Sequence, residues 1–450
     1  MTEPATDAED QPELLPGMVR ATVKASQAKA RATRARRAAE AEPAAVDPVA
    51  RVLVDVPLAH LDRPFDYAVP AAMTDDARPG VRVKVRFAGQ DVDGFLVARA
   101  AASDHPGRLA PLRRVVSPEP VLSPQIEALS AELAERYAGA RADVLRLAVP
   151  ARHATTEQRP SPPATAWTGH DPAAAEAAWA DHEPGAAFLR HLAQGGTPRA
   201  VWNAAPSTDW PALVAHAVAA TYASGRGSLV CVPDHKDVAR VDAALGAALG
   251  EGHHVTLTAD SGPAARYRDF LAISRGARRI VVGTRGAAFA PVHDLGLVVV
   301  WDDGDDLHAE PRAPYPHTRE TLLLRAEREG TAALVGGFVR TVEAEYLVRT
   351  GWAHELTATR DAVRRVWVAI AGDPTRSDVH APAARMPREV HRAIREALVE
   401  GPVLVQTPRL GYVNALACER CRTPARCSAC QGPLALTGPT TPPACRWCAT

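Results

Sequence analysis

The sequence predicts a multidomain α/β protein with a small N-terminal β domain, a larger parallel-sheet domain and a cysteine-rich C-terminal segment. Short strand-like segments with turn residues between them lie from residue 49 to residue 116. From about residue 200, apolar strands alternate with helical segments, which is typical of a doubly wound parallel sheet. Six of the seven cysteines lie in the last 33 residues. With 450 residues, the chain has room for about three domains of ~150 residues each.

The overall charge of the chain does not point to a particular partner. Lys and Arg number 52, as do Asp and Glu, so the formal net charge is zero. No apolar run reaches the ~20 residues of a membrane span, and no secretory h-region is present, so we expect no membrane partner and a cytoplasmic location.

Residues 1–47 are rich in Ala, Glu, Pro and Arg and offer no large apolar face. Every charge from Gly17 to Ala39 is positive. The composition predicts a disordered, solvated basic arm, and contact with DNA is the alternative. Residues 48–118 form the predicted β domain, with strands expected in "RVLVDVPL", "FDYAVP", "VRVKVRFAG" and "DGFLVARA".

A helix is expected early in residues 119–198. Ser123 would cap it, Pro124 would occupy its first turn, and Ile126, Leu129 and Leu133 share one face. The Pro-, Ala- and Thr-rich residues 155–186 favour a loop or a loosely ordered connection.

Residues 199–380 alternate between strands and helices. The expected strands are "SLVCVPD", "HVTLT", "RIVVGT", "LVVVWDD", "AALVGG" and "RVWVAI". A helix, "REVHRAIREALVEG", and a strand, "PVLVQTP", follow within residues 381–417, and residues 418–450 hold the cysteine cluster.

Three Cys-x-x-Cys pairs predict a zinc site in the last segment: Cys418/Cys421, Cys427/Cys430 and Cys445/Cys448. Two such pairs complete a tetrahedral thiolate site, and fourteen residues separate Cys430 from Cys445, which is enough for a hairpin. One pair is left over, so we expect one complete Zn²⁺ site, and a second only if a further pair lies beyond Thr450. Unrelated reduced thiols are the alternative.

These segments together resemble the primosomal replication-restart helicase (PriA) family from about residue 51 onward. The resemblance rests on "RPFDYAVP", "RIVVGTRGAAFAPVHDLGLVVV", "YPHTRETLLLRA", "TPRLGYVNALACERC" and the spacing of six cysteines. It implies a 3′-DNA-end-binding β domain, a winged-helix-like region over 119–198, a RecA-like helicase lobe over 199–380, the start of a second lobe and a zinc-binding region.

The sequence departs from that family where ATP would bind. A P-loop needs glycines, a Lys and a Ser or Thr, but the corresponding "VWNAAPSTDWPALV" offers only Ser207 and Thr208. In "VVVWDDGDD", Trp301 precedes Asp302 and Asp303, and the water-orienting Glu is absent. "GGFVRT" replaces the family's Gly-Ser-Ala-Thr segment. We therefore expect a degenerate ATP site, no catalytic residue and no bound ATP, with the aspartates lying in a solvated loop rather than at a metal.

The resemblance also suggests DNA-contacting residues. It implies that Phe65 and Asp66, with Tyr67 beside them, line a pocket for a terminal nucleotide, whereas most small β domains would use these aromatics in the core. The family's pocket lysine falls near Ala110, where Arg108 or Arg113 would substitute. Arg285 would contact phosphate or simply lie on the surface.

The resemblance favours a replication-restart protein that binds branched or forked DNA with a 3′ end and helps to reload the replicative helicase without unwinding DNA itself. Its implied partners are primosome proteins, single-stranded-DNA-binding protein and the replicative helicase or its loader. The first alternative is an active ATP-dependent 3′-to-5′ helicase with unusual motifs. The second is a generic zinc-ribbon nucleic-acid-binding protein.

Overall fold

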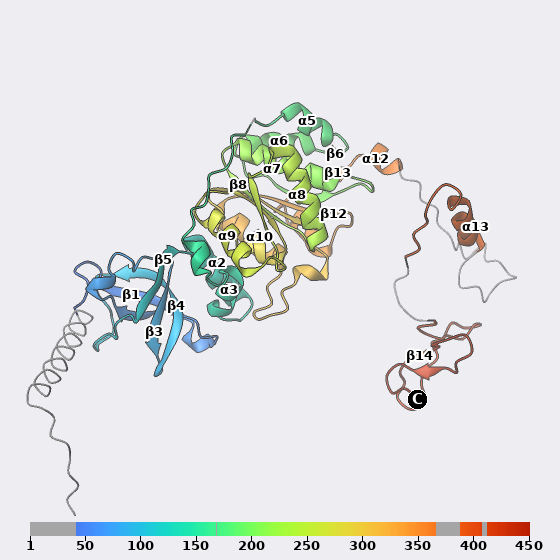
Figure 1. The fold of residues 1–450 in the computed structure, drawn as a ribbon. Coiled ribbons are helices and arrows are strands. Elements are labelled where there is room, and N and C mark those ends of the chain that lie inside the picture. Colours follow the sequence, from blue (N-terminus) through green and yellow to red (C-terminus); the bar gives the residue numbers. More distant parts are fainter. Residues whose placement is uncertain (1–41, 168, 366–387, 407–411) are drawn as a thin grey trace, which may run out of the picture. The chain divides into compact units, whose positions relative to one another are not determined.

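The computed structural model describes residues 42–167, 169–365, 388–406 and 412–450 (Figure 1). The described residues up to 365 belong to one compact unit and those from 388 onward to another. The mixed α/β class with a parallel sheet is confirmed. No helix among the described residues combines the length and apolar character that crossing a membrane requires.

The predicted β domain is a five-stranded antiparallel sheet with the strand order β2-β1-β4-β3-β5. Its strands are β1 (Val49–Val54), β2 (Phe65–Ala68), β3 (Val81–Phe87), β4 (Gln90–Ala100) and β5 (Arg114–Pro120). Alternate residues of β3, namely Val81, Val83 and Val85, are fully buried, as expected for a strand with one face on a core. Strand β5 was not predicted from the sequence, because its prolines and charges conceal its pairing with β3.

Part of the predicted basic arm belongs to this domain. Residues 1–41 lie outside the described residues, but Ala44 is buried and its N–H donates to the Val69 carbonyl at 2.8 Å. Arg99 donates to the carbonyls of Val46 and Asp47. Assigning residues 42–47 to a solvated arm was therefore wrong.

The helix expected after the β domain is α2 (Pro124–Arg136), and Ser123 caps it by accepting a hydrogen bond from Ile126 N at 3.3 Å. It is followed by α3 (Arg141–Ala148) and α4 (Ala154–Glu157). The expected loop over 155–186 was wrong in part, because it contains α5 (Pro172–Ala178) and β6 (His182–Glu183). Asp171 caps α5, and Trp179 just beyond it is fully buried. The winged-helix-like character of this region remains a prediction.

An eight-stranded sheet with the order β6-β13-β7-β12-β11-β8-β10-β9 forms the larger domain. All its neighbouring strands are parallel except β6, which pairs antiparallel with β13 at one edge. The strands after β6 are β7 (Arg199–Asn203), β8 (Gly227–Cys231), β9 (His254–Leu257), β10 (Ile280–Gly283), β11 (Leu295–Trp301), β12 (Ala332–Gly337) and β13 (His354–Ala358). Of these, β7 and β13 were not predicted, and the expected strand "RVWVAI" lies almost wholly outside the described residues.

Helices cover both faces of this sheet (Figure 1). One face packs against α6 (Gly185–Ala193), α7 (Trp210–Ala223) and α8 (His235–Leu249). The other face packs against α9 (Pro263–Ser274), α10 (Thr318–Glu329) and α11 (Val342–Arg349), with α2 and α3 joining the same hydrophobic cluster. The doubly wound arrangement follows from strands whose two faces are both apolar.

A polar cluster that we call the Glu157 clasp links the helical region to this domain. The Glu157 carboxylate, at the end of α4, accepts hydrogen bonds from Ser117, Arg152 and the hydroxyl of Tyr267 on α9. Arg275, which follows α9, pairs with Glu119 of β5 at 2.9 Å and also donates to the Glu157 carbonyl. The clasp therefore joins β5, α4 and α9 through groups that are largely shielded from water.

In the second unit, the expected helix is α13 (Arg388–Ala397), but the predicted strand "PVLVQTP" was wrong, since residues 402–406 have no regular structure. The cysteine segment folds as tight turns and a small hairpin of β14 (Leu434–Ala435) and β15 (Ala444–Cys445). Pairing of these two short strands brings Cys445 and Cys448 back to Cys427 and Cys430, as the fourteen-residue spacing suggested.

Candidate functional site

The segments proposed for a degenerate nucleotide site do meet at one edge of the large sheet. Ser207 and Thr208 lie in the loop after β7, and Asp302 and Asp303 follow β11. Strand β12 separates β7 from β11, and all three strands are parallel. Ligands of open parallel sheets bind at this carboxyl edge, so it is where a nucleotide crevice would be expected.

Tryptophans fill this part of the domain. Trp202 at the end of β7 and Trp301 at the end of β11 flank Gly336 of β12, and their ring centroids are 5.2 Å apart. Trp210, the first residue of α7, stacks on Trp301 with ring centroids 4.3 Å apart and ring planes 9° apart. All three indoles are at most 3% exposed. These rings form a hydrophobic core at the carboxyl ends of β7 and β11, the place where a nucleotide-binding domain has a polar pocket.

A carboxylate caps the start of α7. Asp209 caps this helix by accepting a hydrogen bond from Ala212 N at 3.4 Å. In a phosphate-binding loop, the free N–H groups and positive dipole end at this position would hold the anion. The negative side chain repels phosphate and occupies one of the donors. Ser207, in the left-handed region with φ 68°, is exposed.

The aspartates after β11 differ from one another. Asp303 is 3% exposed and accepts hydrogen bonds from Arg319 at 2.7 Å and from the Thr341 hydroxyl at 2.8 Å. The expectation of a solvated loop was therefore wrong for Asp303. Asp302 is exposed, and partial burial together with Asp305 raises the pKa of its carboxyl. Arg319 already balances the negative charge of Asp303, so Asp303 is a poor candidate for a metal ligand.

Arg285 lies apart from the other proposed DNA-contacting residues. It lines a pocket of about 200 Å³ together with Arg146, Arg266 and Arg312. Its Nε lies 2.9 Å from Glu310, which also pairs with Arg312 at 2.7 Å. Burial alone would raise the pKa of Glu310, but the hydrogen bonds from these two arginines lower it. Contact between Arg285 and phosphate remains a prediction.

Phe65, Asp66 and Tyr67 line one open pocket of about 860 Å³ on the β domain. Four arginines contribute to the same wall: Arg51, Arg63, Arg86 and Arg108. The Arg63 guanidinium lies over the Phe65 ring, 4.9 Å from its centroid, and Phe87 meets that ring edge-on. A planar cation on an aromatic ring is a surface on which a base can stack.

Asp66 and Tyr67, the other two residues predicted for this pocket, have different surroundings. Asp66 Oδ2 accepts a hydrogen bond from Ser103 at 2.5 Å, while Oδ1 lies 3.9 Å from Arg51 Nε, and the Asp66 side chain is 20% exposed. Tyr67 is only 4% exposed, and burial raises the pKa of its hydroxyl, which donates to the Arg86 carbonyl. Tyr67 is thus chiefly a core residue. Arg108 lines the pocket, whereas Arg113 pairs with Asp91 at 3.5 Å.

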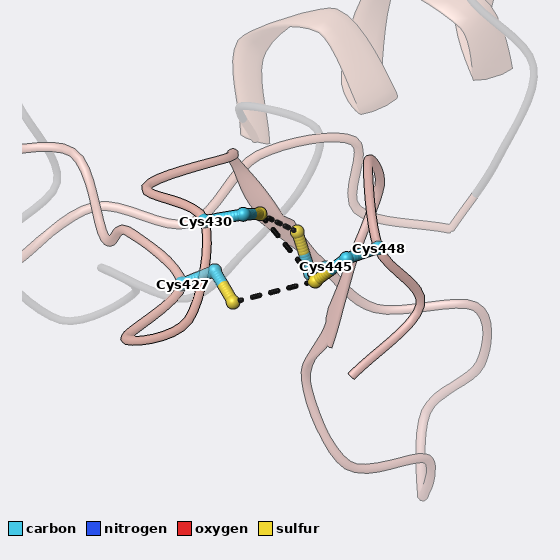
Figure 2. A group of neighbouring side chains, drawn as sticks. All are labelled: Cys427, Cys430, Cys445 and Cys448. Carbon is cyan, nitrogen blue, oxygen red and sulfur yellow. Dashed lines mark hydrogen bonds between the residues drawn. The ribbon is translucent and has the colours of Figure 1, made fainter.

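Four cysteines meet at the hairpin of the second unit and could hold a metal ion (Figure 2). The sulfur atoms of Cys427, Cys430, Cys445 and Cys448 all lie within 4.8 Å of one another, and three of the sulfur–sulfur distances are 3.3 to 3.7 Å. Tetrahedral zinc with Zn–S bonds of ~2.3 Å requires sulfur separations of about 3.8 Å. The Thr450 hydroxyl and backbone lower the pKa of Cys448 to about 6. The Gly432 backbone lowers the pKa of Cys430, but hydrogen bonds with Cys445 and Cys448 raise it to about 12, and a metal needs both side chains as thiolates.

The remaining pair, Cys418 and Cys421, forms a turn of the same kind. Arg422 N donates to the Cys418 carbonyl at 2.9 Å, just as Gln431 N donates to the Cys427 carbonyl, and both donors have a φ near 60°. Cys418 and Cys421 are not part of the four-cysteine cluster. The Thr423 hydroxyl lowers the pKa of Cys421 to about 7. This pair has the geometry of half a metal site.

Sequence reasoning missed several of the residues that shape these regions. Glu157 and Tyr267, which hold the clasp, lie 110 residues apart and carry no local signal. His308 is fully buried, and one ring nitrogen lies 2.9 Å from the Trp301 carbonyl. Burial lowers the pKa of His308, so this ring is a neutral part of the core.

Comparison with known proteins identifies the family. Residues 51–150 match the sequence model of the PriA 3′DNA-binding domain. The probable replication restart protein PriA of Mycobacterium tuberculosis (strain ATCC 25618 / H37Rv) is 51% identical over 406 residues, covering 86% of this chain and 60% of that protein. The chain belongs to the PriA family.

Other similar proteins belong to the same family. The probable PriA of Mycobacterium leprae (strain TN) is 48% identical over 86% of this chain and 61% of its own length, and that of Deinococcus radiodurans is 30% identical over 51% of this chain and 25% of its own length. The chain thus spans about 60% of the length of its mycobacterial relatives. A solved C-terminal domain of the DEAD-box protein Dbp5 matches with a TM-score of 0.25, 14% identity and coverage of 38% of this chain and 99% of that one, and supports no argument.

Proposed function

We propose that this chain is a DNA-binding scaffold for replication restart that recognises a branched DNA with a free 3′ end. It would help to reload the replicative helicase without hydrolysing ATP itself. The observation that carries the proposal is the pocket holding Phe65 and Asp66, which lies inside the segment that matches the PriA 3′DNA-binding domain.

The pocket has the chemistry that a DNA end needs. The Arg63–Phe65 pair offers a face on which the terminal base stacks, and Asp66 Oδ1 can accept a hydrogen bond from the terminal sugar hydroxyl. Arg108, for which the structure shows no ion pair among the described residues, supplies positive charge for a phosphate. A 3′-phosphate would place a second negative charge beside Asp66 and would therefore bind less well than a free hydroxyl.

The tryptophan core supports the absence of ATP hydrolysis. Phosphoryl transfer needs a cradle of N–H donors, a cation and a carboxylate that positions Mg²⁺. At the corresponding positions lie the Asp209 cap, the Trp210–Trp301 stack and Asp303, which is paired with Arg319. The large domain would then act through its shape and its surface contacts.

We extend to this chain the partners that the family resemblance implies. They are primosome proteins, single-stranded-DNA-binding protein and the replicative helicase or its loader, all meeting at the forked DNA. The four-cysteine cluster would hold Zn²⁺ as a structural ion, with Cys427, Cys430, Cys445 and Cys448 as its ligands.

The decisive experiment compares forks that carry a free or a 3′-phosphorylated end with plain duplex, titrated at two salt concentrations. The unmodified chain should prefer the free 3′ end. Phe65→Ala should weaken that preference by about 1–3 kcal/mol and leave duplex binding unchanged. Leu58→Ala, which removes a 46% exposed side chain of the same domain, is the matched control and should change neither. Equal binding of fork and duplex by the unmodified chain would remove the main support for the proposal.

An active ATP-dependent 3′-to-5′ helicase remains the second candidate, because relatives that bear the family name resemble most of this chain. DNA-stimulated ATP turnover that is abolished by Asp302→Asn or Asp303→Asn would favour it over the scaffold. The generic zinc-ribbon protein is no longer favoured, since it does not account for the match of residues 51–150.

A further inference from the structure

The four-cysteine cluster carries an exposed aromatic side chain that metal binding does not explain. Trp447 lies between Cys445 and Cys448 and is 71% exposed. Among the tryptophans that the structure describes, the others are buried or half-buried. Exposing a large indole to water is unfavourable, so such a residue usually marks a contact surface.

The indole is held in place from one side. A Cβ on the buried Gly432 would lie 2.9 Å from the Trp447 ring, so the ring rests directly on this glycine. The Trp447 backbone N–H donates to the Cys445 sulfur at 3.4 Å, which ties the residue to the cluster. A ring that is supported beneath and open above is a flat platform that needs little ordering on binding.

The surroundings of this platform are basic. Residues 418–450 contain four arginines (Arg420, Arg422, Arg426 and Arg446) and one acid, Glu419. All four arginines are exposed, and the structure shows no ion pair or hydrogen bond for their side chains among the described residues. A zinc ion with four thiolates carries a net charge of about −2, so the excess of positive charge is small. The attraction for an anion is therefore local and modest.

We infer that Trp447 is a base-stacking platform for single-stranded DNA, with the surrounding arginines contacting the phosphates. Bases of a duplex are already stacked on one another, so an exposed indole selects the unpaired strand. Stacking on the indole adds affinity that salt does not weaken, whereas each phosphate that an arginine contacts adds affinity that salt does weaken. The inference goes beyond the proposed function, because it adds a DNA contact that requires no 3′ end.

The test uses the full chain and a fluorescently labelled single-stranded circle of deoxythymidines, which offers neither an end nor a duplex. Trp447→Ala should weaken binding of the circle by about 5- to 150-fold, the value of one stacked base. Trp447→Phe should weaken it less, because a smaller aromatic face remains. Leu404→Ala, which removes a 92% exposed apolar side chain from the same unit, should leave binding unchanged.

Metal content, measured on every variant, separates loss of stacking from loss of folding. If Trp447→Ala loses its metal, the conservative Trp447→Phe variant tests the stacking instead. In the unmodified chain, the circle should also quench the emission of the exposed tryptophan. Unchanged affinity of Trp447→Ala with its metal retained would overturn the inference, as would equal losses for the Phe and Ala variants. Phe65→Ala should not affect the circle, so failure here is distinguishable from failure of the 3′-end proposal.

Discussion

The indole rings of Trp210 and Trp301 stack almost in parallel, with planes 9° apart and centroids separated by 4.3 Å. Trp210 is the first residue of α7, the helix after β7, and Trp301 is the last residue of the central strand β11. These are the two elements from which a nucleotide-hydrolysing domain presents its phosphate loop and its metal-binding acid. The stack joins these two elements through a buried apolar contact.

The first prediction tests how tightly this core is packed. Gly336→Ala should lower the free energy of unfolding by about 1–3 kcal/mol, because the new Cβ would lie 2.8 Å from the Trp202 ring and 3.1 Å from the Trp301 ring. The matched control is Gly246→Ala in α8, where nothing lies within 4 Å, and it should stabilise by about 0.5–1 kcal/mol. Urea denaturation of both variants measures the difference, and equal effects would contradict tight packing.

The second prediction concerns the metal. Cys445→Ser should abolish zinc binding, whereas Cys418→Ser should retain one zinc per chain, because only Cys445 belongs to the four-sulfur cluster. Metal binding should also supply much of the folding free energy of the cysteine segment, so a chelator should expose it to protease. Elemental analysis of reduced protein checks the stoichiometry. Finding no zinc in the unmodified chain, or equal losses in both variants, would refute the assignment.

The third prediction concerns pH. Burial would raise the pKa of Glu157, but hydrogen bonds from Arg152, Ser117 and Tyr267 lower it below its model-peptide value of 4.5. Ionised Glu157 therefore stabilises the fold above that value, and the stabilisation is lost as the pH falls through the lower folded-state pKa. Glu157→Gln should cost about 1–3 kcal/mol at pH 7 and reduce the loss of stability on acidification.

Thermal unfolding at pH 7 and at about pH 4 measures this effect. Glu176→Gln, at an exposed ion pair with Arg190, is the control and should change stability by less than about 0.5 kcal/mol. A Glu157→Gln variant with unaltered pH dependence would show that the clasp contributes nothing through ionisation.

The fourth prediction concerns the basic arm. If the basic arm contacts DNA, deleting residues 1–41 should weaken binding of fork and duplex about equally and reduce the salt dependence of both, since its positive charges would contact the phosphates of any DNA structure. The deletion stops at residue 41 because Ala44 belongs to the β domain. A loss confined to the fork, in titrations at two salt concentrations, would instead assign the arm a role in recognising the branch.

Local patterns were enough to predict much of the fold. The alternation in Val81, Val83 and Val85, the Ser123 cap and the apolar run Leu297–Val300 each leave a signal within a few residues. Among the strands that were missed, β5 and β13 carry charges or prolines and depend on pairing with distant partners. The Cys-x-x-Cys spacing likewise predicted the four-sulfur cluster, because each pair encodes its own turn.

The candidate sites were less predictable. The sequence placed Asp303 in a solvated loop, but its burial depends on Arg319 and Thr341, which lie 16 and 38 residues away. The missing lysine and glycines indicated an altered nucleotide site, yet nothing local indicated that Trp210 would stack on Trp301. A missing motif is visible in the sequence, whereas the side chains that fill its place are found only once the strands are assembled.

The Glu157 clasp has a consequence for geometry. Glu119 of β5 pairs with Arg275, which follows α9, so a direct ion pair links the sheet that bears the Phe65 pocket to the large domain. If a DNA strand ends in that pocket, this link would restrict the direction in which the strand leaves the pocket relative to the large domain. The chain would then distinguish branched DNA molecules by the angle between their arms rather than by their base sequence.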